Sequence, residues 1–327
     1  MSDAAAYGPP FPAGLTQDPQ KQRYFGTDSY FLEAYEQLAA LTGDPVAFAH
    51  RHALLLMKPD AVASRSIERI VGWLRDSGFR IVAARRLRMG RGAVRAMWHY
   101  QLNRATPQRC LLADALCGQG DSLVFLLRSG AHTDVPATVA LSVRKGPADP
   151  ARRRPGQLRT RLGDFGFLLN LVHASDEPAD LVRELGILLE HADRSDLCHQ
   201  ALDGTDRYDE ALGLAHDLYA DCPPHDLRVG PATARLRQAV ERLLADGSTL
   251  PHHVRAALRH RLAGTTAEPV SWGPLIELIW SAGLPVTGWD PIVVGNAALP
   301  LSRPQYRQLL SGADPQSWRS PVAADAL

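Results

Sequence analysis

Hydrophobic positions between residues 53 and 190 follow two alternating patterns. Short apolar runs have the length of buried strands, and they cover residues 53–57, 79–87, 122–127 and 167–172. Between these runs, apolar residues recur at steps of three and four, which is the spacing of a helix with one buried face. This spacing predicts helices that begin at Ser66, at Thr133 or Asp134 and at 176–178, and a longer helical stretch over 93–117 that breaks near Pro107.

This order of elements predicts an α+β fold. Strand-helix-strand units with intervening helices suit a ferredoxin-like, four-stranded antiparallel sheet with helices on one face. The flanking segments have other patterns. Residues 1–50 read as an irregular, Pro- and Gly-rich arm over 1–27 and then a helical segment over 28–50, and 195–327 as helices joined by prolines, one of them over 252–262. We therefore expect three parts: an N-terminal arm and helix (1–50), an α+β domain (51–194) and an all-α extension (195–327).

Two motifs at the ends of predicted strands carry candidate chemistry. In LLLMKPDAV, residues 54–62, a buried strand ends at Lys58. In NLVHASDEP, residues 170–178, a strand ends at His173 and a helix begins directly after it. A side chain beside a helix N-terminus is well placed to meet a phosphate group, because the free backbone N–H groups and the helix dipole favour an anion there.

At these residues the chain resembles the nucleoside diphosphate kinase family. The family has a KPD tripeptide after its first strand and an N-x-x-H-x-S-D segment around a nucleophilic histidine, and both occur here in the family's order. The segment PGQLR, residues 155–159, and the pair His99–Tyr100 are also similar to family motifs. Glu184 follows His173 by eleven residues, which is the family's spacing for the glutamate that orients the histidine. The resemblance covers about residues 53–190.

The resemblance implies a ping-pong kinase that uses ATP or another nucleoside triphosphate. The γ-phosphoryl group would pass to His173 and then to a nucleoside diphosphate or another small acceptor. Catalytic roles would fall to His173, Lys58, Glu184 and Tyr100. Nucleotide and phosphate groups would be bound by Lys58, Arg159, Asn170, Arg144, Lys145 and Ser175. Mg²⁺ would be carried by the nucleotide phosphates rather than by a protein site.

Several family positions differ in this chain. The family's base-stacking aromatic residue falls on Gln108, and a phosphate-binding arginine falls near Thr138. The threonine that accompanies this arginine falls near Arg144 or Lys145, at the start of a segment with seven basic residues and one acidic residue over 144–161. Such a basic segment suits a polyphosphate. We therefore predict a divergent member, with an altered acceptor or base preference.

Composition narrows the setting. The formal net charge of the 327-residue chain is +1, so no overall field favours nucleic acid. No apolar run is long enough to span a bilayer, and the N-terminus lacks a secretory pattern. The four cysteines form no CxxC pair. We expect a cytoplasmic protein without a membrane or nucleic-acid partner, and assembly as a homodimer or larger oligomer.

Two alternatives stay open at this level. A nucleotide-binding or regulatory module would keep the fold without turnover, and the missing aromatic and arginine favour it. Other nucleotide-dependent chemistry on the same fold, such as activation of a carboxylate, is the third possibility.

Overall fold

The core of the protein is a four-stranded antiparallel sheet with strand order β2-β3-β1-β4. The computed structural model describes residues 10–130, 135–246, 250–263, 270–310 and 312–319. The strands are β1 (His52–Met57), β2 (Phe79–Leu87), β3 (Ser122–Ser129) and β4 (Val172–Ala174). The ferredoxin-like α+β fold predicted from the order of elements is therefore confirmed, and β2 has the predicted limits.

The fourth strand is shorter than predicted. Residues 167–171 form a loop, and only Val172–Ala174 pair with β1. Leu171 has a φ of 66°, which lies in the left-handed region and interrupts an extended strand. Its backbone N–H bonds to the Asp60 carboxylate rather than to a neighbouring strand. The segment is apolar, as a strand would be, but the side chains of Asp60 and Asn296 accept hydrogen bonds from its backbone N–H groups.

Helices cover the sheet on both faces, so the expectation of one covered face is wrong. All six residues of β1 are buried, which requires neighbours on both sides. One group contains α5 (Ile67–Asp76) and α9 (Ala137–Lys145), which contact strands and share α10 (Leu158–Leu162) as a neighbour. The second group contains α11 (Pro178–Leu188) and α12 (His191–Asp203), which contact strands and pack against α2 (Ser29–Thr42).

The N-terminal arm contains a helix that was not predicted, α1 (Pro19–Phe25), within the segment 1–27. The segment predicted to be helical, 28–50, forms α2 and α3 (Pro45–Arg51), and aspartates are the N-caps of all three helices. Helix α2 packs closely on α11 at Gly186, where a Cβ atom would meet the backbone carbonyl of Tyr30. The arm therefore forms a second layer outside the helix that follows β4.

The segment between β2 and β3 forms three short helices instead of one interrupted helix. These are α6 (Arg91–Met97), α7 (His99–Leu102) and α8 (Pro107–Cys117). Thr106 caps α8 by accepting a hydrogen bond from the Arg109 N–H, and Pro107 occupies the first helical turn. The short helices α4 (Pro59–Ala63) and η1 (Pro150–Arg152) complete the connections around the sheet. The predicted start at Thr133 or Asp134 lies outside the described residues.

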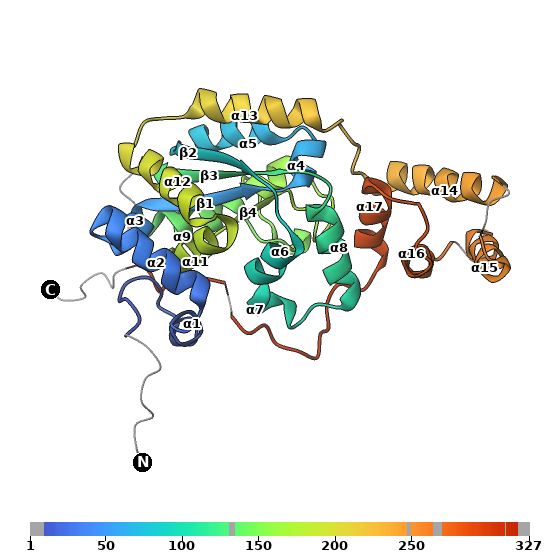
Figure 1. Ribbon diagram of the computed structural model, residues 1–327, viewed down its shortest axis with the longest axis horizontal. Coiled ribbons are helices and arrows are strands. Elements are labelled where there is room, and N and C mark those ends of the chain that lie inside the picture. The colour runs from blue at the N-terminus through green and yellow to red at the C-terminus, as the bar shows by residue number, and fades with distance from the viewer. Residues whose placement is uncertain (1–9, 131–134, 247–249, 264–269, 311, 320–327) are drawn as a thin grey trace, which may run out of the picture.

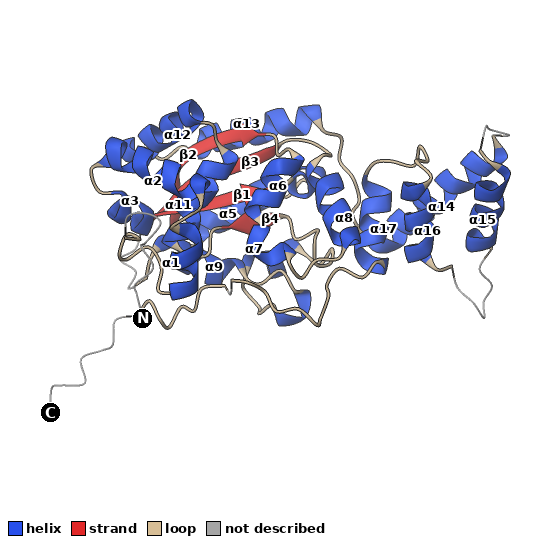
Figure 2. Cartoon of the chain, turned by 60° about the horizontal axis from the view of Figure 1, so that its bottom comes forward, coloured by secondary structure: helices blue, strands red, loops and turns tan. Residues whose placement is uncertain are grey.

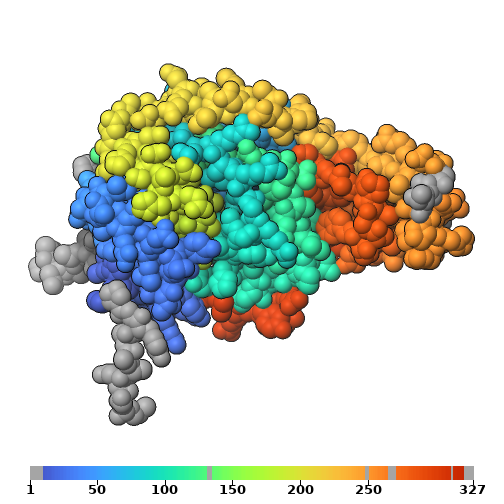
Figure 3. Space-filling view, in the orientation of Figure 1, coloured from blue at the N-terminus to red at the C-terminus, as the bar shows by residue number. Residues whose placement is uncertain are grey.

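The C-terminal part is helical, as predicted. It contains α13 (Tyr208–Asp221), α14 (Val229–Ala245), α15 (His252–Leu262), α16 (Trp272–Ser281) and α17 (Trp289–Ala298). Helix α13 contacts β2, whereas α14, α15 and α16 project away from the sheet (Figure 1). Figure 2 shows α17 between these helices and α8, and Figure 3 shows the projecting lobe on one side of the molecule. Among the described residues, no helix has the length and apolar character required to cross a membrane.

After α17 the chain turns back toward the sheet domain. Ser302 forms an isolated β-bridge with Ala105, and the N–H of Leu309 bonds to the Tyr100 carbonyl. Figure 1 shows this return segment in red along the lower edge, beside α7. Its last described contact is the Trp318 indole N–H, which donates to the buried Glu177 carboxylate at 3.0 Å. The extension is therefore joined to the domain at both its beginning and its end.

Candidate active site

His173 lies in β4, opposite Leu56 of β1, directly before the turn that begins α11. Its side chain is 18% exposed, so the ring is largely enclosed but accessible from one side. The edge of the Trp98 ring contacts it, with the ring centroids 5.7 Å apart. The sequence brings it there because a buried apolar strand ends at this point and Pro178 starts the next helix.

Glu184 and Ser175 fix one edge of the histidine ring. His173 Nε2 lies 2.8 Å from Glu184 Oε1, and Ser175 Oγ donates to Glu184 Oε2 at 2.5 Å. Because a carboxylate accepts, Nε2 carries the proton in the neutral ring and Nδ1 keeps its lone pair. In the described part of the chain, Nδ1 has no hydrogen-bond partner. The arrangement presents one nucleophilic nitrogen in a defined orientation.

Two buried cations lie behind this edge. Lys145, only 5% exposed, donates from Nζ to the Ala174 carbonyl at 3.1 Å and lies 3.7 Å from an Asp176 oxygen. Burial lowers the pKa of Lys145 to about 8, and the nearby Asp176 carboxylate opposes this shift. Arg159 is 6% exposed, and burial together with the positive charge of Arg153 lowers its pKa to about 10.

Most N–H groups of the Arg159 guanidinium donate hydrogen bonds to oxygens of the protein. Its terminal nitrogens donate to the Gly146 carbonyl at 2.9 Å, to the Val172 carbonyl at 2.5 Å and to Asn170 Oδ1 at 3.2 Å. Its Nε is buried and has no partner among the described residues. Arg159 therefore stabilises the segment before His173 as well as supplying positive charge near it.

Lys58 is held by the loop that precedes β4. Its Nζ donates to the Leu168 carbonyl at 2.7 Å and lies 3.4 Å from Asp60 Oδ2. The same Asp60 oxygen accepts the Leu171 N–H at 3.0 Å, and the Lys58 N–H donates to the Leu171 carbonyl. Asn170 also bonds within this loop, to the Phe167 carbonyl at 2.7 Å. The KPD segment and the loop therefore form one hydrogen-bonded unit.

Tyr100 lies beneath the N-terminal arm. Its hydroxyl donates to Asp28 Oδ2 at 3.4 Å, and the Arg183 guanidinium lies over its ring at 5.0 Å. Burial, with a contribution from Asp28, raises the pKa of Tyr100 to about 12. Arg183 also donates to Asp28, at 2.7 Å. In this structure Tyr100 thus belongs to a cluster with the arm and α11.

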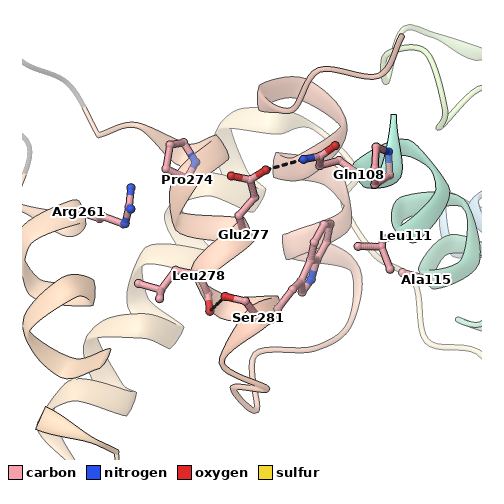
Figure 4. Close-up of a pocket in the computed structure, with 10 residues that line it drawn as sticks. Gln108, Leu111, Ala115, Arg261, Pro274, Glu277, Leu278 and Ser281 are labelled. Atoms are coloured by element: carbon pink, nitrogen blue, oxygen red, sulfur yellow. Dashed lines mark hydrogen bonds between the residues drawn. The ribbon is translucent and has the colours of Figure 1, made fainter. Parts of the chain in front are cut away.

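Two other sequence-selected residues point away from His173. Arg144 is exposed and donates to the Ser77 carbonyl at 2.7 Å. Gln108 Nε2 donates to Glu277 of α16 at 2.7 Å, as Figure 4 shows. The His173 ring itself contacts Glu184 and Trp98, and Ser175 is joined to it through Glu184.

A separate cavity lies where α8 meets the extension. It has a volume of about 650 Å³ and includes Gln108, Leu111 and Ala115 on one face of α8. Opposite these residues, α16 contributes Glu277 and Trp280, and Arg261 comes from α15 (Figure 4). His173 is not among its lining residues, so this cavity is not the space in front of the histidine.

One residue in contact with the site loop had no sequence motif to mark it. Asn296 of α17 is 6% exposed and bonds with both ends of its amide to the loop before β4. A single polar residue within the apolar stretch PIVVGNAALP, residues 291–300, is the only signal for it in the sequence. Asp28 and Arg183, which hold Tyr100, likewise belong to no motif.

Comparison with known proteins gives a consistent picture. A family model described as nucleoside diphosphate kinase matches residues 51–193. The nucleoside diphosphate kinase of Thermoplasma acidophilum is 31% identical over 142 residues, which is 43% of this chain and 88% of that protein. The enzyme from Parafrankia is 32% identical over 136 residues, covering 41% of this chain and 91% of the relative.

Two further matches extend the comparison. Human thioredoxin domain-containing protein 6 is 29% identical over 188 residues, which is 56% of this chain and 54% of that protein. Among solved structures, an NDP kinase from Pyrobaculum aerophilum is 18% identical with a TM-score of 0.37. That alignment covers 44% of this chain and 97% of the other.

Proposed function

The chain belongs to the nucleoside diphosphate kinase family, and from this membership we propose that it is a nucleotide-dependent phosphotransferase that works through a phosphohistidine at His173. The observation that carries the proposal is the Glu184 carboxylate 2.8 Å from His173 Nε2, with Ser175 on its other oxygen. This contact orients the ring, and the opposite nitrogen is left available.

The first half of the reaction forms one bond and breaks one. The lone pair of His173 Nδ1 attacks the γ-phosphorus of the nucleoside triphosphate, and the bond from that phosphorus to the bridging β-phosphate oxygen breaks. The nucleoside diphosphate leaves with this electron pair. The ring gains positive charge as the N–P bond forms, and the Glu184 carboxylate on Nε2–H stabilises it. An acceptor oxygen then forms a bond to the phosphorus as the N–P bond breaks, and its electron pair returns to Nδ1 of the neutral imidazole.

Positive charge for the transferring group comes from buried residues. Lys145 and Arg159 lie in the segments beside β4, and Arg159 has a buried Nε without a partner in the described structure. Cations in a low-dielectric site interact more strongly with phosphate oxygens than exposed ones do. Lys58, in this proposal, keeps its bond to the Leu168 carbonyl and donates another of its three N–H groups to the nucleotide phosphates. Asn170 would bind the nucleotide beside it.

We assign Mg²⁺ to the phosphates of the nucleotide. The carboxylate bonded to the His173 ring is Glu184, and its other oxygen accepts from Ser175. Asp60 is bonded to the loop and to Lys58. Mg²⁺ would reduce the negative charge on the phosphates, and the chain would supply orientation and the remaining cations.

The acceptor in this proposal is a nucleoside diphosphate or a specialised small molecule. Gln108 replaces the family's aromatic residue and is bonded to Glu277, so the base would be held differently from the family's pattern. Because nucleoside triphosphates are the donors, the proposal places the protein in the cytoplasm. Assembly into a homodimer or larger oligomer stays a prediction.

The test is incorporation of the γ-phosphoryl group. We expect ATP labelled at the γ-position to label the protein, and acid to remove the label while alkali preserves it. His173→Ala should lower labelling more than about a thousandfold, because the nucleophile is gone. Labelling of His173→Ala at the wild-type level, or a label that survives acid, would exclude the phosphohistidine.

A non-turnover nucleotide-binding module is the second candidate, and one observation favours it. Arg159 and Tyr100 donate to protein oxygens in this structure. If these bonds persist when nucleotide binds, the phosphates lack their partners for transfer. Nucleotide binding measured by calorimetry, together with no label in the wild-type protein, would select this candidate over the kinase.

A further inference from the structure

We infer that α17 is a functional part of the active site and that Asn296 is the residue through which it positions Lys58 and Asn170. The inference rests on the proposed phosphotransferase function. It assigns a role to a helix that lies more than a hundred residues beyond His173 and outside the segment, 51–193, that matches the family model.

The contact itself is a two-point clamp on backbone groups. Asn296 Nδ2 donates to the Phe165 carbonyl at 2.8 Å, and its Oδ1 accepts the Leu168 N–H at 3.0 Å. The side chain is 6% exposed, so water does not readily replace either bond. The loop also accommodates it closely. Gly166, with a φ of 93°, has no room for a Cβ atom beside the Asn296 amide.

The clamped residues are those that hold the catalytic groups. Leu168 bonds to both sides: its N–H donates to Asn296, and its carbonyl accepts from the Lys58 ammonium at 2.7 Å. The Phe167 carbonyl accepts the Asn170 amide at 2.7 Å, and Asn170 Oδ1 accepts from Arg159. A shift of this loop therefore displaces Lys58 and Asn170 together. Side chains must lie within a fraction of an ångström of their productive position, so such a shift slows transfer.

The helix that carries Asn296 is itself firmly placed. Ile292 and Val293 are buried, and Gly295 packs against Leu112 of α8. At its first turn, Asp290 forms an ion pair with Arg235 of α14 and a hydrogen bond with the His225 ring. The backbone N–H of His225 bonds to the Ala63 carbonyl, close to the KPD segment. The clamp thus acts from a fixed support rather than from a mobile tail.

The test compares Asn296→Ala and Asn296→Asp with a matched control in the same helix. Asn296→Ala removes both bonds. Asn296→Asp keeps an acceptor for the Leu168 N–H but places a carboxylate against the Phe165 carbonyl. The control is Val294→Ala, because Val294 is buried on the opposite side of α17 and its truncation weakens packing without touching the loop.

Two measurements distinguish positioning from stability. For both Asn296 variants we expect amide hydrogen exchange over residues 164–171 to rise at least about tenfold. We also expect phosphohistidine formation at saturating ATP to slow by about tenfold. Val294→Ala should lower the unfolding temperature as much or more, with exchange over 164–171 and the labelling rate within about twofold of wild type.

The two readouts also separate this inference from the proposed function. Absence of label in the wild-type protein would contradict the phosphotransferase, and loop exchange would still decide whether Asn296 clamps the loop. Unchanged exchange over 164–171 in Asn296→Ala overturns the inference in every case. A labelled wild type with equally fast labelling of both Asn296 variants overturns it as well.

Discussion

The candidate active site has two corners that are built in different ways. The nucleophile corner contains His173, Ser175 and Glu184, all within one strand-turn-helix unit of twelve residues. The loop corner contains Lys58 and the segment 165–171, and α17 holds it from more than a hundred residues away. The first corner needs only local folding and a sheet to support it. The second is also held by Asn296 of α17, so the extension and Lys58 are physically linked.

The largest expected effect concerns the buried cation beside the nucleophile corner. Lys145 has a pKa of about 8 in the folded protein and 10.5 as the ordinary value. Between these pH values the unfolded chain binds the additional proton, so Lys145 makes stability rise with pH across this window. The shift corresponds to about 3 kcal/mol.

Lys145→Met should abolish this rise. The measurement is the free energy of unfolding by urea at pH 7.5, 9 and 10.5, for wild type, Lys145→Met and Arg144→Met. Arg144 is the exposed neighbour on the same helix and should leave the pH dependence intact. If the free energy of unfolding changes with pH in the same way for wild type and Lys145→Met, burial does not lower the pKa of Lys145.

The next effect breaks the nucleophile corner itself. Glu184→Gln keeps the size of the side chain but replaces the carboxylate that stabilises charge on the ring. We expect phosphohistidine formation to slow by roughly 10- to 100-fold, with nucleotide affinity nearly unchanged. Rapid-quench labelling at saturating ATP measures this, and Glu190→Gln, an exposed carboxylate just beyond α11, is the control. Equal rates for both variants would remove Glu184 from the mechanism.

A smaller effect is expected when the loop corner is perturbed by a substitution in the loop itself. Gly166→Ala introduces a side chain at a φ of 93° and against the Asn296 amide. We expect a loss of unfolding free energy of about 1–2 kcal/mol, because L-residues rarely adopt this conformation. Chemical denaturation measures the loss. Gly72→Ala, in helix α5 with open space around it, should be neutral or stabilising.

The smallest effect is expected for Gln108→Ala, which tests whether the nucleotide base contacts Gln108. Its amide is exposed and bonded to Glu277, so Gln108→Ala should change the unfolding free energy by less than about 0.5 kcal/mol. Nucleotide affinity, measured by calorimetry, should change less than about twofold, because the side chain points to α16. A tenfold loss of affinity would place the base against Gln108 and extend the nucleotide site toward the cavity in Figure 4.

Much of the fold followed from apolar periodicity. The limits of β2 and α15 agree with the prediction, and β1 and β3 agree within two residues at one end. The predicted elements were wrong where contacts between distant segments, rather than the local sequence pattern, set the backbone conformation. Residues 167–171 have a strand's composition, but Asp60 and Asn296 bind their backbone, and Leu171 turns into the left-handed region. The arm over 1–27 has a loop's composition, yet Asp18 caps a short helix there.

Apolar periodicity predicts the order of strands and helices, because buried strands and amphipathic helices have different repeats along one continuous segment. The resemblance to the family implies the contact between His173 and Glu184, and the two side chains are bonded in the structure. The groups that hold Lys58, the acceptor of the Tyr100 hydroxyl and the partner of Gln108 emerge only from the tertiary structure. Each of these is a polar contact between segments far apart in the chain. Such contacts leave no periodic trace, because a single Asn or Asp satisfies them from any element that packs nearby.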